Sequence, residues 1–201
     1  MKFDPAKIDN KLIYRLLTSI IVPRPIAWVS TKSVDGINNL APFSYFNMVG
    51  DDPPHLMFST RRDNNSNKDT LTNVLETGQF VVNMVTKPLV EAMNATAEAV
   101  GPEVDEFQLV GVTPISSVIV KPMRVAESPI QMECELAHHY FLEGHQQGGA
   151  CVLIGRIVQI HVQNEYLLEE NKINSELYQP IARLGGSNYS ELGNLFSVKR
   201  K

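Results

Sequence analysis

The strongest constraint in this sequence is an Asp35-Gly36 pair between two strand-like segments, residues 26–31 and 39–44. Asp-Gly favours the tight turn of a β-hairpin, because glycine takes a positive φ at little cost. Residues 26–31 alternate with the two-residue period of a β-strand. Pro42 cannot donate a backbone hydrogen bond, so the return segment is predicted to be an edge strand, a bulge or a loop. We therefore expect free backbone amides there, suited to a flat ligand with polar edges.

The rest of the chain indicates a mainly β fold with a few helices. A short amphipathic helix is expected before Pro23. A second should begin at Ser66, with Asp69 at the third position of a capping box, and end at Gly78. Strands and helices cluster rather than alternate, which favours an antiparallel barrel or sandwich with helices at its ends over a doubly wound parallel sheet. With 201 residues, we expect a single domain spanning residues 1–201. The remaining predicted elements are strands at residues 55–60, 80–85, 118–120, 130–136 and 150–162 and a helix from Pro88 to about Ala99.

Composition narrows the possible partners and the compartment. The formal charge of −4 and a pI near 5.7 argue against a nucleic-acid partner. No apolar run is long enough to cross a membrane, and the N-terminus has no apolar core of a signal peptide. Cys134 and Cys151 lie in apolar runs, so we expect two buried free thiols in a reducing compartment, the cytoplasm.

A phosphate site is one candidate, between Arg61 and Thr70. A helix N-terminus offers unpaired N–H groups and a partial positive charge of about half an electron. Lys68 and Thr70 belong to the first turn of the predicted helix, and Ser59 and Arg61 approach from the preceding strand. The alternative is a capped surface helix with solvated cations. No Walker-type or G-x-G-x-x-G sequence exists, so nucleoside triphosphates and Rossmann-type NAD binding are poorly supported.

A ring-binding platform is the second candidate, at residues 39–44. A flavin-like ring needs hydrogen-bond donors for its carbonyl groups and N5, acceptors for N3–H, and apolar faces. The backbone of residues 40–43 and the Ser44 hydroxyl could supply the polar edge. The alternative is that Trp28, Phe43 and the neighbouring aromatic residues belong to the core.

Acid–base and metal chemistry find little support. The five histidines are scattered, and neither H-E-x-x-H nor C-x-x-C occurs. Glu133 and Glu135 lie two apart on one strand and are interpreted as a solvated face. No metal site and no catalytic side chain are therefore predicted. If the protein is an enzyme, a bound cofactor is expected to carry the reaction.

Several motifs, in order along nearly the whole chain, resemble the flavin reductase-like family, and its flavoredoxin-type branch in particular. The motifs are residues 24–31 (RPIAWVST), 39–47 (NLAPFSYFN), 52–54 (DPP), 68–70 (KDT), 78–83 (GQFVVN), 105–107 (DEF), 133–134 (EC) and 182–189 (ARLGGSNY).

The resemblance implies an FMN-binding split β-barrel, an antiparallel Greek-key-like barrel with flanking helices, that forms a homodimer. It implies FMN as cofactor, with FAD also possible, and NADH or NADPH as electron donor. By this resemblance, one set of residues lines the isoalloxazine and ribityl chain: Trp28, Val29, Ser30, Thr31, Asn39, Leu40, Ala41, Pro42, Phe43 and Ser44. A second set surrounds the phosphate, and two tail residues add a wall: Ser59, Arg61, Lys68, Asp69 and Thr70, then Arg183 and Tyr189.

Three functions remain open from the sequence. One is an NAD(P)H-dependent flavin reductase. Another is an electron carrier with tightly bound FMN, no nicotinamide activity of its own and a redox partner protein. The third is a split-barrel module that binds a flavin or another anionic cofactor for a structural or sensing role.

Overall fold

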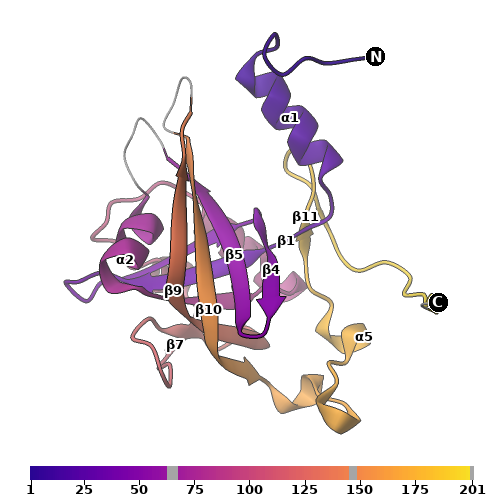
Figure 1. Ribbon diagram of the computed structural model, residues 1–201. Helices are drawn as coiled ribbons and strands as arrows, with labels where there is room; N and C mark the ends of the chain where they lie inside the picture. The colour runs from indigo at the N-terminus through magenta and orange to yellow at the C-terminus, as the bar shows by residue number, and fades with distance from the viewer. Residues whose placement is uncertain (63–67, 145–148, 200–201) are drawn as a thin grey trace.

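A seven-stranded antiparallel sheet forms the body of the protein (Figure 1). The computed structural model describes residues 1–62, 68–144 and 149–199. The strand order is β3-β2-β6-β9-β10-β5-β4, so β3 and β4 are the two edges. A mainly β, antiparallel fold is therefore confirmed. The strands are β2 (Ala27–Lys32), β3 (Asn38–Phe43), β4 (Phe46–Asp51), β5 (Pro54–Arg61), β6 (Gln79–Met84), β9 (Ile130–Leu142) and β10 (Ala150–Val162).

The predicted hairpin is the β2–β3 pair. Gly36 has φ of +88°, and the register places Val29 opposite Ala41. Because β3 is an edge strand, the position predicted from Pro42 is confirmed. Only Ser44 and Tyr45 separate the end of β3 from the start of β4, so the chain joins the two edges of the sheet directly.

Helices and short strands surround the sheet. Helix α1 (Asn10–Ile20) is the predicted helix before Pro23, and the Asp9 carboxylate caps it by accepting from the Leu12 amide at 2.8 Å. Figure 1 shows α1 projecting from the body, beside the C-terminal arm. The other elements are α2 (Asp69–Thr77), η1 (Lys87–Leu89), α3 (Val90–Ala95), α4 (Glu106–Val110), η2 (Asn164–Tyr166), η3 (Glu169–Asn171), α5 (Ser175–Tyr178) and the short strands β1 (Arg24–Pro25), β7 (Pro114–Ile115), β8 (Arg124–Val125), β11 (Ala182–Arg183) and β12 (Tyr189–Ser190).

Both predicted helices of the central region differ from expectation at one end. Helix α2 ends at Gly78, which has φ of +69° as predicted, but its N-cap is Lys68. Ser66, the predicted cap, lies outside the described residues. Helix α3 stops at Ala95 rather than near Ala99. The Thr96 hydroxyl donates to the Met93 carbonyl at 2.8 Å and accepts from Trp28 Nε1 at 2.9 Å, which holds Thr96 at the end of the helix.

Two apolar clusters fix these elements on the sheet. In one, Leu71 and Val74 of α2 pack on the sheet with Phe58, whose ring lies 5.0 Å from that of Phe43 and 5.3 Å from that of Phe80. The second cluster, on the other side of β2, contains Trp28, Leu40, Met93 and Phe107. Each such fully buried side chain stabilises the fold by about 1.5–3 kcal/mol.

The predictions for residues 118–120 and for Glu133 were wrong. Residues 118–120 form a loop whose backbone amides all donate to the Glu133 carboxylate, at 2.7 to 3.0 Å. His161 Nε2 lies 2.6 Å from the same carboxylate. Glu133 is fully buried, whereas Glu135 is partly exposed and pairs with Arg156 at 2.7 Å. The backbone amides of this loop therefore bond to the buried Glu133 carboxylate, and not to the carbonyl groups of a neighbouring strand.

Three further observations complete the fold. The Arg24 guanidinium donates to the carbonyls of Thr18, Ile21 and Leu184, which ties α1 and the C-terminal arm to the body. Both cysteines are buried and free, as predicted. None of the helices in the described parts of the chain combines the length and apolar character needed to cross a bilayer.

Candidate functional site

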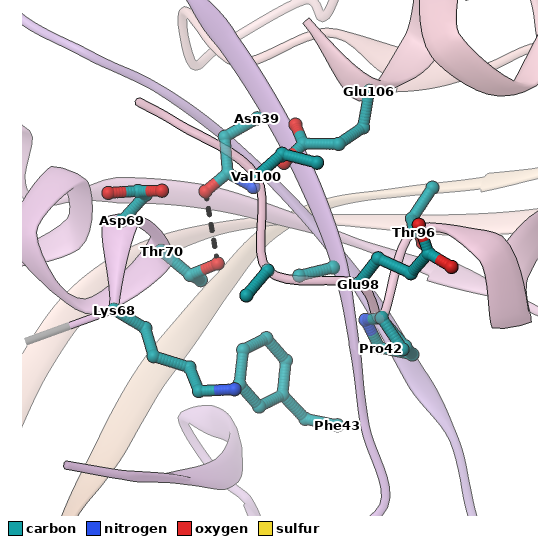
Figure 2. Close-up of a pocket in the computed structure, with 13 residues that line it drawn as sticks. Asn39, Pro42, Phe43, Lys68, Asp69, Thr70, Thr96, Glu98, Val100 and Glu106 are labelled. Carbon is teal, nitrogen blue, oxygen red and sulfur yellow. Dashed lines mark hydrogen bonds between the residues drawn. The ribbon is translucent and has the colours of Figure 1, made fainter. Parts of the chain in front are cut away.

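A cavity of about 340 Å³ lies between the edge strand β3 and the start of α2 (Figure 2). It brings together seven of the residues predicted for cofactor binding, from two separate sequence motifs at residues 39–47 and 68–70: Asn39, Ala41, Pro42, Phe43, Lys68, Asp69 and Thr70. The remaining wall comes from the segment after α3 and from α4: Thr96, Ala97, Glu98, Ala99, Val100 and Glu106.

One hydrogen bond joins the two sides of the cavity. The Thr70 hydroxyl donates to Asn39 Oδ1 at 3.1 Å, and both side chains are buried. Lys68 is the N-cap of α2, and its ammonium group has no acceptor with which to cap the helix, so this side chain leaves the first N–H groups of α2 unbonded. Helix α2 runs for nine residues, and its first N–H groups carry the partial positive charge of a helix N-terminus. This end of the cavity suits an anionic group.

The free edge of β3 offers acceptors rather than donors. In an antiparallel pair, residues alternate between those whose N–H and C=O face the partner strand and those whose groups face away. The Leu40 amide faces away from β2, because it donates to Glu106 Oε2 at 3.0 Å. Two residues on, Pro42 faces the same way and has no N–H. The expectation of free amides at residues 40–43 was therefore wrong, since only carbonyl groups remain at this edge.

Three carboxyl groups line the cavity, and one of them, that of Asp69, lies in the first turn of α2 beside Lys68. The Glu106 residue is 5% exposed, and Figure 2 shows its carboxyl group directed toward Asn39 and Val100, with Lys68 and Phe43 at the opposite end of the view. Burial raises the pKa of Glu106, and bonds from backbone amides, Leu40 first, counteract this in part. Burial likewise raises the pKa of Asp69. The exposed Glu98 adds a third acid.

Five predicted residues lie behind the cavity wall. Trp28, Val29, Ser30, Thr31 and Leu40 are completely buried. Ser30 donates its hydroxyl to the Met123 carbonyl, and Thr31 accepts from Asn73 Nδ2 at 3.0 Å. The described side chains of this group support the cavity from the core and do not line it.

The other predicted residues lie elsewhere. Ser44 lies in a separate apolar pocket beneath α1, where its hydroxyl accepts from Arg24 Nε at 3.4 Å. Ser59 and Arg61 lie on β5 outside the cavity, and the Arg61 guanidinium lies 5.5 Å from the centre of the Tyr14 ring. In the C-terminal arm, Arg183 stacks on the Tyr189 ring at 4.4 Å, and the Tyr189 hydroxyl donates to Asn94 Oδ1 at 2.9 Å.

Sequence reasoning missed the wall formed by residues 96–100 and by Glu106. The segment was assigned to the end of a helix, and its departure from the helix depends on the contact between Thr96 and Trp28. A local signal existed for Glu106, because Asp105 before it caps α4 by accepting from the Phe107 amide at 2.9 Å. Across residues 1–62, 68–144 and 149–199, no group of three His, Cys, Asp or Glu side chains is arranged to hold a metal ion.

The chain is similar to known proteins over most of its length. Residues 19–178 match the family described as "Flavin reductase like domain". The crystal structure of nitrilotriacetate monooxygenase component B from Bacillus cereus is 39% identical, with a TM-score of 0.94 and 98% of each chain covered. The 2-nitrobenzoate 2-nitroreductase NbaA of Pseudomonas fluorescens is 31% identical, with a TM-score of 0.88, and the match covers 100% of this chain and 96% of that one. The flavoredoxin of Desulfovibrio vulgaris (Miyazaki F), at 20% identity and a TM-score of 0.79 with 98% and 97% covered, shares the split-barrel fold.

Proposed function

Because the chain belongs to the flavin reductase-like family, we propose that it is an FMN-binding oxidoreductase that uses NADH or NADPH to reduce flavin. One observation carries the proposal: Lys68 and Thr70 at the start of α2 share a single cavity with the edge of β3. An anion-binding helix start and a strand edge that presents acceptors correspond to the two ends of FMN, its phosphate and the N3–H side of its ring.

The residues present fit such a cofactor. Lys68 would neutralise phosphate charge, and the α2 amides would donate to it. The carbonyl groups at the free edge of β3 would accept from N3–H. Phe43 and Pro42 would contact an apolar face of the ring. Ser59, Arg61, Arg183 and Tyr189 remain proposed contributors from the neighbouring strand and the C-terminal arm.

The protein's own part in this chemistry is to bind and orient. When bound, the flavin itself supplies hydride and electron transfer. The Thr70–Asn39 bond holds the two sides of the cavity in register, and the small apolar side chains of Ala97, Ala99 and Val100 line one side of it. No side chain has to act as nucleophile.

A second candidate is an electron carrier with tightly bound FMN. The similarity to a protein described as component B of a monooxygenase favours this option, because a component hands its product or electrons to another protein. Under this hypothesis, a redox partner protein is required and NAD(P)H alone has no effect.

We also propose a homodimer in the cytoplasm. The edge strand β4 exposes Met48 and Val49, at 68% and 54%, and the β9–β10 hairpin exposes Tyr140, Phe141 and Leu142. Exposed apolar residues on an unpaired edge favour burial against a second copy. The two buried free thiols suit a reducing compartment.

The test begins with an absorption spectrum of the purified protein and titration with FMN, FAD and riboflavin. Oxidation of NADH or NADPH is then followed with free FMN present. We expect FMN to bind more tightly than riboflavin and nicotinamide oxidation to exceed the rate without protein. A protein that binds FMN but is reduced only through a partner reductase would support the carrier instead. Absence of flavin binding would refute both and leave the module with a structural or sensing role.

A further inference from the structure

The cavity contains a buried acid that phosphate binding does not require. Glu106 reaches it from α4 and is 95% buried, since its exposed fraction is 5%. One carboxylate oxygen accepts from the Leu40 amide on the edge of β3, and the side chain also forms part of the cavity wall. The group that fixes this edge of the cavity is therefore a potential negative charge beside the expected position of the ring.

We propose that Glu106 lowers the reduction potential of the bound flavin by opposing the negative charge that reduction adds. This inference rests on the proposed function, because it assumes that FMN occupies the cavity. Its geometric basis is the position of Glu106 on the wall that includes β3, at the end away from Lys68 in Figure 2.

Reduction changes the charge of the bound flavin, and Glu106 is close enough to the cavity to interact with that change. A hydride from reduced nicotinamide carries two electrons and one proton, so the bound cofactor gains one negative charge unless a further proton follows from water. A buried carboxylate interacts with that added charge through a medium of low effective dielectric, where repulsion is stronger than in water. The chain therefore holds oxidised FMN more tightly than reduced FMN.

Other charges face Glu106 and modulate the effect. Asp69 from α2 and the neighbouring Asp105 add negative charge, and exposed Glu98 contributes from the segment after α3. Lys68 is the one cation of the described cavity wall. Burial raises the pKa of Glu106, so a proton can be taken up there when reduction adds charge. We expect the potential to become more dependent on pH than that of free FMN in the range where Glu106 titrates.

The experiment compares dissociation constants for oxidised and dithionite-reduced FMN. In the unaltered protein, reduced FMN should bind at least tenfold more weakly than oxidised FMN. Glu106→Gln keeps an acceptor for the Leu40 amide but removes the charge. The ratio of the dissociation constant of reduced FMN to that of oxidised FMN should then fall about tenfold. This fall corresponds to a rise in the reduction potential of about 30 mV for a two-electron couple. Glu91→Gln removes an exposed acid of α3 that does not line this cavity; it is the control and should leave the ratio unchanged.

The outcomes separate this inference from the proposed function. FMN that binds with an unchanged ratio in Glu106→Gln overturns the role of Glu106 and leaves the proposed function intact. If the unaltered protein binds reduced FMN more tightly than oxidised FMN, the role of Glu106 is overturned without any variant, and the proposed function again stands. A protein that binds neither form overturns both.

Discussion

The hydroxyl of Thr70 and the side-chain amide oxygen of Asn39 are 3.1 Å apart, across a sequence separation of 31 residues. This bond joins the first turn of α2 to the edge of β3. Both residues are less than 10% exposed, at 1% and 7%. Two sides of the proposed flavin site are thus in direct contact within the protein.

Thr70→Val tests that connection. Valine keeps the shape of threonine but leaves Asn39 Oδ1 buried without this donor, so we expect the free energy of unfolding to fall by about 1–3 kcal/mol. FMN affinity should fall as well. Urea denaturation and FMN titration measure the two effects. Thr72→Val, on the same helix with a half-buried side chain, is the control. Unchanged stability in Thr70→Val would show that the bond contributes little.

Lys68→Ala tests the phosphate position. A charge-assisted contact is worth roughly 1.5–3 kcal/mol, so FMN should bind about ten- to a hundredfold more weakly. Riboflavin has no phosphate and its affinity should hardly change. Lys121→Ala removes an exposed lysine that does not line this cavity and should leave both affinities as they were. Equal losses for FMN and riboflavin in Lys68→Ala would contradict the assignment. Calorimetry provides both constants.

Glu133→Gln should destabilise the protein. The carboxylate accepts three backbone amides from residues 118–120, and an amide side chain presents N–H where one of its oxygens was. We expect a loss of about 1–3 kcal/mol. Glu135→Gln, on the same strand but partly exposed, should stay within about 0.5 kcal/mol of the parent. Comparable losses in the two variants would mean that burial of Glu133 has no special effect.

The stabilisation that Glu133 provides should also depend on pH. Burial favours the neutral acid, but hydrogen bonds from the loop amides and His161 outweigh it and lower the pKa of Glu133. A lowered pKa in the folded state stabilises the protein above the pKa of the unfolded chain, about 4.3, and this stabilisation is lost as pH falls through the folded pKa. The difference in stability between the parent and Glu133→Gln should therefore shrink in acid. Denaturation at pH 7 and below pH 4 checks it; a difference that grows in acid would contradict the role.

Met48→Asp tests the proposed dimer. A charge on the exposed edge of β4 should oppose burial of this strand against a second copy, so the variant should elute as a monomer in size-exclusion chromatography with light scattering. Val34→Asp places the same charge at an equally exposed position near the β2–β3 turn, at 69%, and should leave the oligomer intact. A parent protein that is monomeric, or a dimeric Met48→Asp, would exclude this face as the interface.

Local signals predicted much of the fold. The hairpin turn and the end of α2 depend on Gly36 and Gly78, which both take a positive φ, and such positions are visible in the sequence. The α2 side and the β3 side of the cavity were also predicted from local signals, a helix N-terminus before Thr70 and Pro42 in the return segment of the hairpin. The third side could not be, because Thr96 and Glu106 are placed by bonds to residues 68 and 66 positions away. The prediction for Glu133 was wrong because Glu133 and the partly exposed Glu135 are two residues apart and lie on the same face of the strand. The partners of Glu133 are in a loop that the sequence does not place beside it.

Edge strands of a sheet usually present a row of donors and acceptors on which another chain can assemble. On β3 that row is interrupted twice in succession, since Glu106 already occupies the amide of Leu40 and Pro42 has none to offer. An incoming peptide would find no ladder to extend at this border. Glu106 thus protects the part of this border at Leu40 against strand pairing, and the part at Pro42 lines the cavity, where a small molecule can reach it.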